Sequence, residues 1–210
     1  MIDVKITMVG ELATNCYIIT DTATGYKAII DPGATSPSVR GIIKNSPDKV
    51  KYILLTHGHF DHIGYVGTIK RETNAKIVIS RQEASCLSEP EKSLSHMFFG
   101  KKLESVIPDI LLEDGDTLNL GSSEIKFILT PGHSSGSGCY IVDEKIFTGD
   151  TLFRLSIGRT DLPTGSYREM VKSLKRLSEL EGEYYIYPGH GEASMLSYEK
   201  NFNPYLKQVI

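Results

Sequence analysis

The segment "THGHFDHIG", residues 56–64, places His57, His59, Asp61 and His62 within a few positions of one another. The chain has only six histidines, so half of them lie in this short stretch. Neutral imidazole and carboxylate groups are good ligands for zinc and also for iron or manganese. Without a cation, four such groups packed together would carry a steep desolvation cost and would repel one another once protonated. The cluster therefore predicts a metal site.

Further candidate ligands follow other apolar segments. His133 follows "EIKFILTPG", Asp150 follows "KIFTG" and His190 follows "YYIYPG", just as the cluster follows "VKYILLT". Buried strands hold their ends rigidly, and the loops beyond them can direct polar side chains into a shared cleft. Seven such groups are more than one ion can use, so two ions are expected.

The positions of these groups suggest how they divide between the two ions. The first ion would have three histidine ligands, because neighbouring histidines in an extended H-x-H segment can reach one metal. The second ion would have ligands that lie farther along the same loop. The set predicted for the first ion is His57, His59 and His133, the set for the second is Asp61, His62 and His190, and Asp150 would bridge them.

Each of these residues also has a structural explanation. A single histidine at a strand end is more often a hydrogen-bonded structural residue, and Gly-Asp, as at Asp150, is a common turn. Asp31 in "IIDPG" also ends an apolar segment, and we expect it to support the site rather than bind metal. His96 in "SLSHMFFG" lies among apolar residues and is expected to pack or to line a pocket. The cluster as a whole, rather than any single residue, carries the metal prediction.

The elements that must position these residues are mostly strands. Short β-branched and aromatic segments recur along the chain and are typical of strands. They cover residues 3–9, 16–20, 27–31, 50–56, 75–80, 124–130, 139–142, 145–150 and 184–189.

Helical patterns lie between the strand segments. One covers 166–180, where Ser166 and Glu169 form a capping box. Others are expected to begin at Ser36-Pro37 and to follow Ile63 toward residue 73. Together these patterns favour the α+β class, with two mixed sheets packed together and flanked by helices as an αββα sandwich. The length of 210 residues fits a single domain over 1–210.

Composition and charge restrict the partners and the compartment. The net charge is −3 and no basic run is present, so neither nucleic acid nor an anionic membrane surface is an expected partner. Acidic residues at Asp3 and Glu11 argue against a signal peptide, and no apolar stretch approaches the ~20 residues of a membrane span. Cys16, Cys86 and Cys139 form no CxxC pair and are expected to be reduced thiols. We expect a cytoplasmic protein that acts on a small molecule.

Several segments resemble a known family. In this order and at these separations, "THGHFDHIG", "PGHSSGS", "FTGDTLF" and "YPGHG" resemble the metallo-β-lactamase superfamily of hydrolases. The resemblance spans nearly the whole chain and implies the αββα metallo-β-lactamase fold with a dinuclear site and the division of ligands given above. Within the superfamily, "GDTLFRLSIGRTDLPTGS" and "YPGHGEASMLSYEKNFNPYL" look most like small glyoxalase II-type (hydroxyacylglutathione hydrolase-like) proteins, which hydrolyse thioesters such as S-lactoylglutathione.

The resemblance implies a metal-dependent hydrolase that uses a metal-bound hydroxide on a thioester, such as an S-acylglutathione-like acyl thiol. Two divalent ions would generate the hydroxide and stabilise the oxyanion, with zinc expected and iron or manganese as alternatives. Asp61 is the candidate catalytic residue, because it could orient the hydroxide while binding an ion. Arg159 and Asp161 in "GRTD" are expected to brace the adjacent loop as an ion pair, with contact between Arg159 and an anionic substrate as the alternative.

Three alternative functions are compatible with parts of the same pattern. A persulfide dioxygenase would hold a single iron with His57, His133 and Asp150, and such enzymes resemble this chain in carrying "GRTD". A two-metal nuclease is disfavoured by the acidic charge balance. A binding module without activity is disfavoured because all seven ligand candidates are present. Residues 82–106 fit either a pocket wall or a packed helix, and the pattern does not decide between them.

Overall fold

The computed structural model describes residues 1–99 and 103–209, without the side chains of residues 98 and 99. Its strands form two six-stranded sheets and one two-stranded ribbon. The first sheet has the order β1 (Ile2–Val9), β2 (Thr14–Asp21), β3 (Lys27–Ile30), β4 (Val50–Leu54), β5 (Lys76–Ser80) and β6 (Ile110–Leu112). The second has the order β14 (Ser194–Met195), β13 (Tyr185–Pro188), β10 (Lys145–Gly149), β9 (Gly138–Val142), β8 (Ser123–Leu129) and β7 (Thr117–Leu120). The ribbon pairs β11 (Leu152–Phe153) with β12 (Ser156–Ile157).

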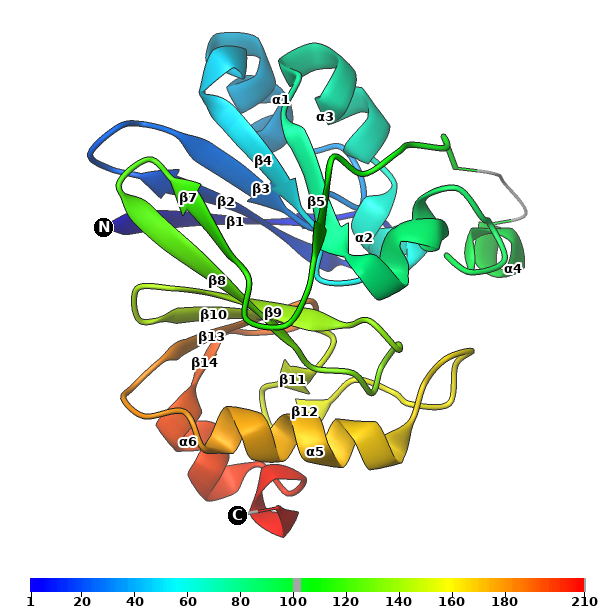
Figure 1. Ribbon diagram of the computed structural model, residues 1–210, viewed down its shortest axis with the longest axis vertical. Coiled ribbons are helices and arrows are strands. Elements are labelled where there is room, and N and C mark those ends of the chain that lie inside the picture. Colours follow the sequence, from blue (N-terminus) through cyan, green and yellow to red (C-terminus); the bar gives the residue numbers. More distant parts are fainter. Residues whose placement is uncertain (100–102, 210) are drawn as a thin grey trace.

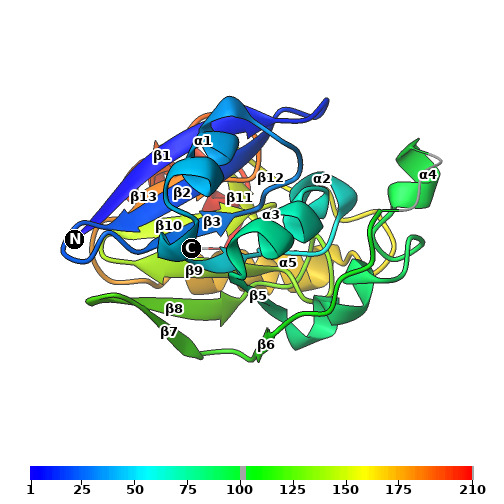
Figure 2. The same cartoon turned by 90° about the horizontal axis from the view of Figure 1, so that it is seen from above.

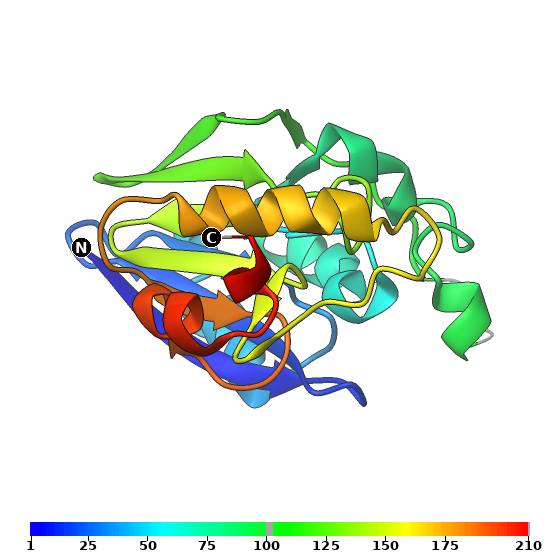
Figure 3. The same ribbon diagram turned by 90° about the horizontal axis from the view of Figure 1, so that it is seen from below.

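Helices cover the outer faces of both sheets (Figure 1). α1 (Pro37–Asn45) and α3 (Val66–Thr73) lie over the first sheet, where Figure 2 views them from above, and the short α2 (Phe60–Ile63) precedes α3. α5 (Tyr167–Ser178) and α6 (Leu196–Phe202) cover the second sheet, as seen from below in Figure 3. α4 (Ser95–Phe99) lies to one side, and the described part of the chain also contains three 3-10 turns: η1 (Pro47–Lys49), η2 (Arg81–Leu87) and η3 (Leu206–Gln208). The predicted αββα sandwich of two mixed sheets is confirmed.

The predicted helix starts are observed, with one difference. Ser36 Oγ accepts a hydrogen bond from Val39 N at 3.1 Å, and Pro37 is the first residue of α1. Ser166 Oγ accepts from Glu169 N at 3.4 Å and so caps α5. The capping box is only half made, because Ser166 N donates to Gly132 O at 2.8 Å instead. This bond fixes the start of α5 against the loop that carries His133.

The apolar core between the two sheets accounts for the apolar strand segments in the sequence. Side chains from the facing sides of both sheets interlock there, including Tyr17, Phe127, Tyr140 and Phe147, each at most 2% exposed. Burying a side chain of this kind stabilises a fold by roughly 1.5–3 kcal/mol. All nine predicted strand segments coincide with strands of the structure.

The two sheets meet where the site lies. β4 runs parallel to β3 and β5, and β10 runs parallel to β13, so the loops after β4, β10 and β13 emerge at one edge of the sandwich. Gly138 N donates to Thr56 O at 2.9 Å, and Tyr140 Oη donates to Leu55 O at 2.9 Å. These bonds join β9 of the second sheet to the segment after β4 of the first. None of the described helices combines the length and the apolar character that a membrane-spanning helix needs.

Candidate metal centre

All seven side chains predicted as ligands lie together at this edge, on the loops after β4, β8, β10 and β13. Five are buried, whereas Asp61 and His190 are partly exposed. Three groups of three side chains have potential ligand atoms within 4.8 Å of one another: His57 with His59 and His133, His57 with His62 and Asp150, and Asp61 with His62 and His190. The first and third groups are the two sets expected from the sequence.

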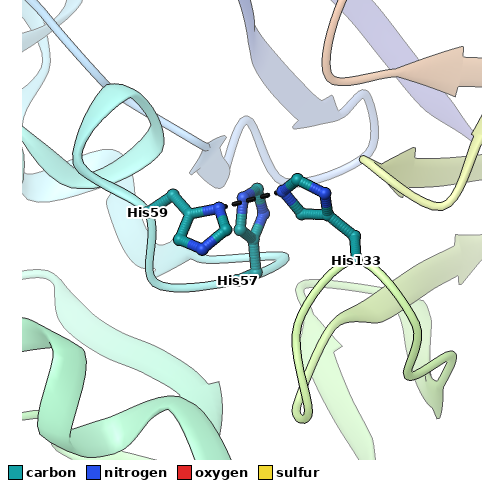
Figure 4. Close-up of side chains that lie close together, drawn as sticks. All are labelled: His57, His59 and His133. Carbon is teal, nitrogen blue, oxygen red and sulfur yellow. Dashed lines mark hydrogen bonds between the residues drawn. The ribbon is translucent and has the colours of Figure 1, made fainter. Parts of the chain in front are cut away.

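The first group consists of three imidazole rings that face one another (Figure 4). His59 Nδ1 lies 2.9 Å from His133 Nε2. The ring centroid of His57 lies 4.7 Å from that of His59 and 4.9 Å from that of His133. Two of the rings come from the loop after β4 and the third from the loop after β8. The group therefore joins the two sheets.

The second group surrounds the Asp61 carboxylate. His62 Nε2 lies 3.3 Å and His190 Nε2 lies 3.2 Å from Asp61 Oδ2. The Asp150 carboxylate lies between the two groups, with 3.5 Å to His62 Nε2, 3.5 Å to His133 Nε2 and 3.6 Å to His190 Nε2. Asp150 is therefore placed where a bridging ligand is expected.

Hydrogen bonds fix which ring nitrogen faces the centre in three of the histidines. Nδ1 of His133 donates to Arg159 O at 2.8 Å, and Nδ1 of His190 donates to Leu12 O at 3.2 Å. Nδ1 of His62 lies 3.0 Å from a carboxylate oxygen of Asp31. Carbonyl and carboxylate oxygens accept, so Nδ1 carries a proton and Nε2 is the ring nitrogen that points to the centre.

The turn that carries His190 is also fastened to the first hairpin of the chain. Asn15 Nδ2 donates to Pro188 O at 3.0 Å and to Gly191 O at 2.8 Å. Tyr17 Oη donates to Pro188 O at 2.6 Å. The β1–β2 hairpin thus holds this turn on both sides of the histidine.

The arrangement fits bound cations. His57 Nε2, His62 Nε2 and Asp150 Oδ1 are the buried side-chain nitrogen and oxygen atoms of the described residues that make no hydrogen bond. Burying polar atoms without partners is costly, so such atoms call for a ligand. Lone pairs of nitrogen and carboxylate oxygen that face one another at these distances repel unless a positive charge lies between them. Imidazole and carboxylate are suitable donors for divalent transition metals.

The protonation equilibria of the site also suit a metal. Burial lowers the pKa of His57 well below its usual range, and the neighbouring charge of His62 lowers it further. Burial and the neighbouring His133 lower the pKa of His59 to about 3. Burial alone would raise the pKa of Asp61, but the charge of His62 and the hydrogen bonds from His190 and His62 together outweigh it and hold this pKa below its usual range. His57 and His59 are thus neutral and Asp61 is ionised at neutral pH, as metal ligands must be. Burial would lower the pKa of His62 and of His190, but neighbouring carboxylates raise both, so these two rings would release a proton on binding a metal.

Asp31, expected to support the site, lies at the end of β3 and faces two parts of the centre. Its carboxylate accepts from Thr56 N at 2.8 Å and from Thr56 Oγ1 at 2.6 Å, and it lies 3.0 Å from His62 Nδ1. Its backbone has a φ of +50°, a conformation that aspartate tolerates better than most residues. Asp31 therefore orients His62 and holds the residue that precedes His57, which supports the predicted role.

Glu83 is a site residue that the sequence did not reveal. It lies in η2, is 2% exposed, and accepts from Gly58 N and from Gly136 N, each at 2.9 Å. Gly58 separates His57 from His59, and Gly136 lies in the loop of His133. One carboxylate therefore ties together the two loops that carry the three-histidine group. In the sequence, the only indication of this contact is the presence of the two glycines. In the structure, a Cβ on Gly58 would lie 3.1 Å from Glu83 Oε2 and one on Gly136 would lie 2.8 Å from Glu83 Cγ, so there is little room for a side chain at either position.

The comparison with known families decides the classification. The family model described as "Metallo-beta-lactamase superfamily" matches residues 9–190. The chain belongs to the metallo-β-lactamase superfamily. The sequence resemblance is thereby confirmed, together with the expected fold.

Relatives within the superfamily cover almost the whole chain. The hydroxyacylglutathione hydrolase GloC of Haemophilus influenzae is 32% identical over 208 residues, which are 97% of this chain and 98% of that protein. The crystal structure of BLEG-1 B3 metallo-β-lactamase superposes with a TM-score of 0.90 at 30% identity, covering 98% of this chain and 99% of the other. The di-iron-bound form of TTHA1623 superposes with a TM-score of 0.81 at 29% identity, covering 96% and 99%. The chain is a metallo-hydrolase of the metallo-β-lactamase superfamily.

A cavity of about 410 Å³, here named the metal-centre cavity, lies over the candidate ligands. It is lined by candidate ligands and by Leu12, Phe60, Leu94, Phe153, Arg159 and Leu162. Its size is within the range of small-molecule sites. The metal-centre cavity thus combines polar candidate ligands with apolar side chains.

The segment 82–106 contributes only in part to this cavity. Leu94 lines it, whereas Met97 is 66% exposed. His96 is exposed as well, so the prediction that it packs or lines a pocket was wrong. The reason is that α4 lies at the side of the molecule, away from both sheets (Figure 1). Residues 100–102, and the side chains of Phe98 and Phe99, lie outside the described residues.

Arg159 and Asp161 form the expected ion pair, but on the surface. Arg159 Nε and Nη2 donate to the two carboxylate oxygens of Asp161, each at 2.7 Å. The side chains are 58% and 66% exposed, and exposed pairs contribute little to stability. The loop is instead held through its backbone, because Arg159 O accepts the bond from His133. Arg159 also lines the metal-centre cavity, which makes contact with a substrate geometrically feasible.

Proposed function

We propose that this metallo-hydrolase cleaves thioesters of the glyoxalase II type, an acyl thiol being its substrate, at a site that holds two divalent ions. Zinc is the expected ion, with iron and manganese as alternatives. The proposed ligands are His57, His59 and His133 for one ion and Asp61, His62 and His190 for the other, with Asp150 between them. The convergence of unpartnered buried ligand atoms on one point carries this proposal.

The choice of substrate class rests on a relative. The protein GloC, which matches this chain over nearly its full length, is named a hydroxyacylglutathione hydrolase. We extend the thioesterase chemistry in that name to this chain, without assigning the thiol carrier. We also propose a cytoplasmic location, because all three cysteines are free, as thiols in a reducing compartment are.

The side chains of the metal-centre cavity have distinct roles in the proposed hydrolysis. Ions bound there would supply an activated water and polarise the thioester carbonyl. The Asp61 carboxylate would accept a hydrogen bond from the attacking water and so orient it toward the carbonyl carbon. Leu94, Phe153 and Leu162 would exclude bulk water from the reacting group. The leaving thiolate requires no general acid, because an ordinary thiol has a pKa of only about 8.5.

The decisive experiment combines metal analysis with turnover. The protein is purified anaerobically, its metals are measured by plasma mass spectrometry, and hydrolysis of S-lactoylglutathione and of other acyl thiols is followed with and without oxygen. We expect about two equivalents of metal and hydrolysis that does not depend on oxygen. One equivalent of iron, together with oxygen uptake on a persulfide and no hydrolysis, would instead identify a dioxygenase.

Arg159→Ala separates the two roles considered for this residue. Because the ion pair is exposed, we expect the melting temperature to change by less than about 2 °C. If the guanidinium contacts an anionic substrate, KM for an anionic acyl thiol should rise roughly 2- to 5-fold, with kcat unchanged. Asp161→Ala is the matched control, since it removes the pair but keeps the positive charge, and it should leave KM unchanged or lower. A large fall in the melting temperature of Arg159→Ala would instead support the interpretation that the ion pair braces the loop.

A further inference from the structure

A second cavity of about 400 Å³, here named the side cavity, lies next to the metal-centre cavity. It is enclosed by the β1–β2 turn, by the segment after β3, and by α2 with the residues that follow it. Its side-chain lining includes Leu12, Ala34, Phe60, Tyr65 and Leu103. None of the candidate ligands except Asp61 lines it.

The chemistry of the side cavity is that of an apolar binding site. Among the described residues that line it there is no lysine, arginine or histidine. Its charged members are acidic: Glu11 is exposed on the turn, and the Asp61 carboxylate accepts from Thr14 Oγ1 at 2.8 Å and faces the metal centre, so this lining disfavours an anionic group. By contrast, Arg159 lines the metal-centre cavity. A neutral apolar group is the ligand that this lining favours.

The floor of the side cavity is backbone, held at a close approach. A Cβ on Gly33 would lie 1.4 Å from Asp61 O, and one on Gly64 would lie 2.3 Å from Gly33 O. No side chain other than hydrogen fits at either position. The two glycines therefore allow the segment after β3 to lie against α2 beside Asp61.

The two cavities share part of their lining. Leu12, Phe60 and Asp61 belong to both. Leu12 is 51% exposed, while its carbonyl oxygen holds His190, so its side chain stands at the boundary between the cavities and is anchored to the metal centre. A ligand with one group at the metal centre therefore has an apolar space next to it on one side and Arg159 on another.

We propose that the side cavity binds the apolar acyl chain of the thioester while the thioester carbonyl lies at the metal centre. This inference rests on the proposed thioesterase function and specifies its substrate class: acyl thiols with an aliphatic or aromatic acyl group larger than acetyl or lactoyl. The thiol carrier then extends toward Arg159.

The test is a series of acyl thioesters of one neutral thiol, N-acetylcysteamine, from acetyl through butanoyl and hexanoyl to octanoyl. Each methylene buried in the cavity should raise kcat/KM by up to about 4-fold, until the cavity is full. A thioether that cannot be hydrolysed, S-octyl-N-acetylcysteamine, provides a measurement that is independent of turnover. Calorimetry should show that it binds more tightly than the S-ethyl compound.

Two variants change the volume of the side cavity without touching a candidate ligand. Ala34→Leu fills part of it and should abolish the increase with chain length, while acetyl thioester turnover and bound metal remain as in the wild type. Tyr65→Ala enlarges it and should shift the optimum to longer chains. Ala23→Leu makes the same substitution as the first variant on an exposed turn and should change nothing. Melting temperature and metal content verify that each variant is folded.

The outcomes separate this inference from the function on which it depends. If no acyl thioester is hydrolysed, the proposed function fails. If thioesters are hydrolysed but kcat/KM does not depend on chain length, the function stands and the side cavity is not the acyl site. The same conclusion follows if Ala34→Leu reduces turnover of all chain lengths equally, or if the thioether binds equally well to both volume variants and the wild type.

Discussion

His59→Ala is expected to reduce kcat/KM by more than roughly 100-fold and to weaken metal binding by a similar factor, because even residues that only support a ligand change affinity by 10- to 100-fold. The metal-free protein should remain folded. His59 is 5% exposed and its Nδ1 pairs with His133 Nε2 at 2.9 Å, so the variant loses one buried hydrogen bond, which contributes about 1 kcal/mol. We expect the melting temperature of the metal-free variant to lie within about 4 °C of the wild type.

His96→Ala is the matched control for this prediction. It removes the one histidine that lies outside the cluster, and its side chain is exposed on α4. Metal content, turnover and melting temperature should all equal those of the wild type. Full activity of His59→Ala with normal metal content would be incompatible with the proposed ligand set.

Glu83→Gln is expected to lower metal affinity and kcat by roughly 10- to 100-fold without removing any candidate ligand. Glutamine has almost the same shape, but only one of its two terminal atoms can accept a hydrogen bond. Its amide group would face either Gly58 N or Gly136 N, each of which donates to the carboxylate at 2.9 Å in the structure. One ligand loop would therefore lose its buried partner and its fixed position.

Hydrogen exchange distinguishes this positioning role from a general loss of stability. In Glu83→Gln the amide of Gly58 or of Gly136 should exchange faster, while amides in the strands of both sheets keep their protection. Glu91→Gln, in an exposed position of the same segment, should leave exchange, metal affinity and turnover unchanged. Unaltered exchange at both glycines, combined with normal metal affinity in Glu83→Gln, would show that the carboxylate does not position the loops.

The longer strands and the candidate ligands could be predicted because each corresponds to a local pattern in the sequence. β-branched and aromatic runs mark β2, β4, β8 and β13, and the histidines follow directly after such runs. The strands β6, β7, β11, β12 and β14 were missed, and each of them has only two to four residues. Their pairing depends on contacts between distant segments, which a local pattern does not encode.

The supporting residues were harder to predict than the ligands for a related reason. Glu83 lies in a polar segment that has the composition of an exposed surface, and glutamate is rarely buried without a cation beside it. Its role becomes visible only when the backbone of two other loops is placed against it. Asp31 was easier, because it ends a strand as the ligands do. The side cavity could not be predicted at all, since its lining comes from four separate segments.

The attachment of the His190 turn to the first hairpin affects how the protein is made in the cell. Hydrogen bonds from Asn15 and Tyr17 to Pro188 span 173 and 171 residues, and the bond from His190 to Leu12 spans 178. Contacts this distant in sequence form slowly, and a nascent chain forms them only after its last strands have left the ribosome. All seven candidate ligands can therefore come together only once the chain has been made through His190, and a ribosome-bound fragment that lacks β13 cannot assemble the site.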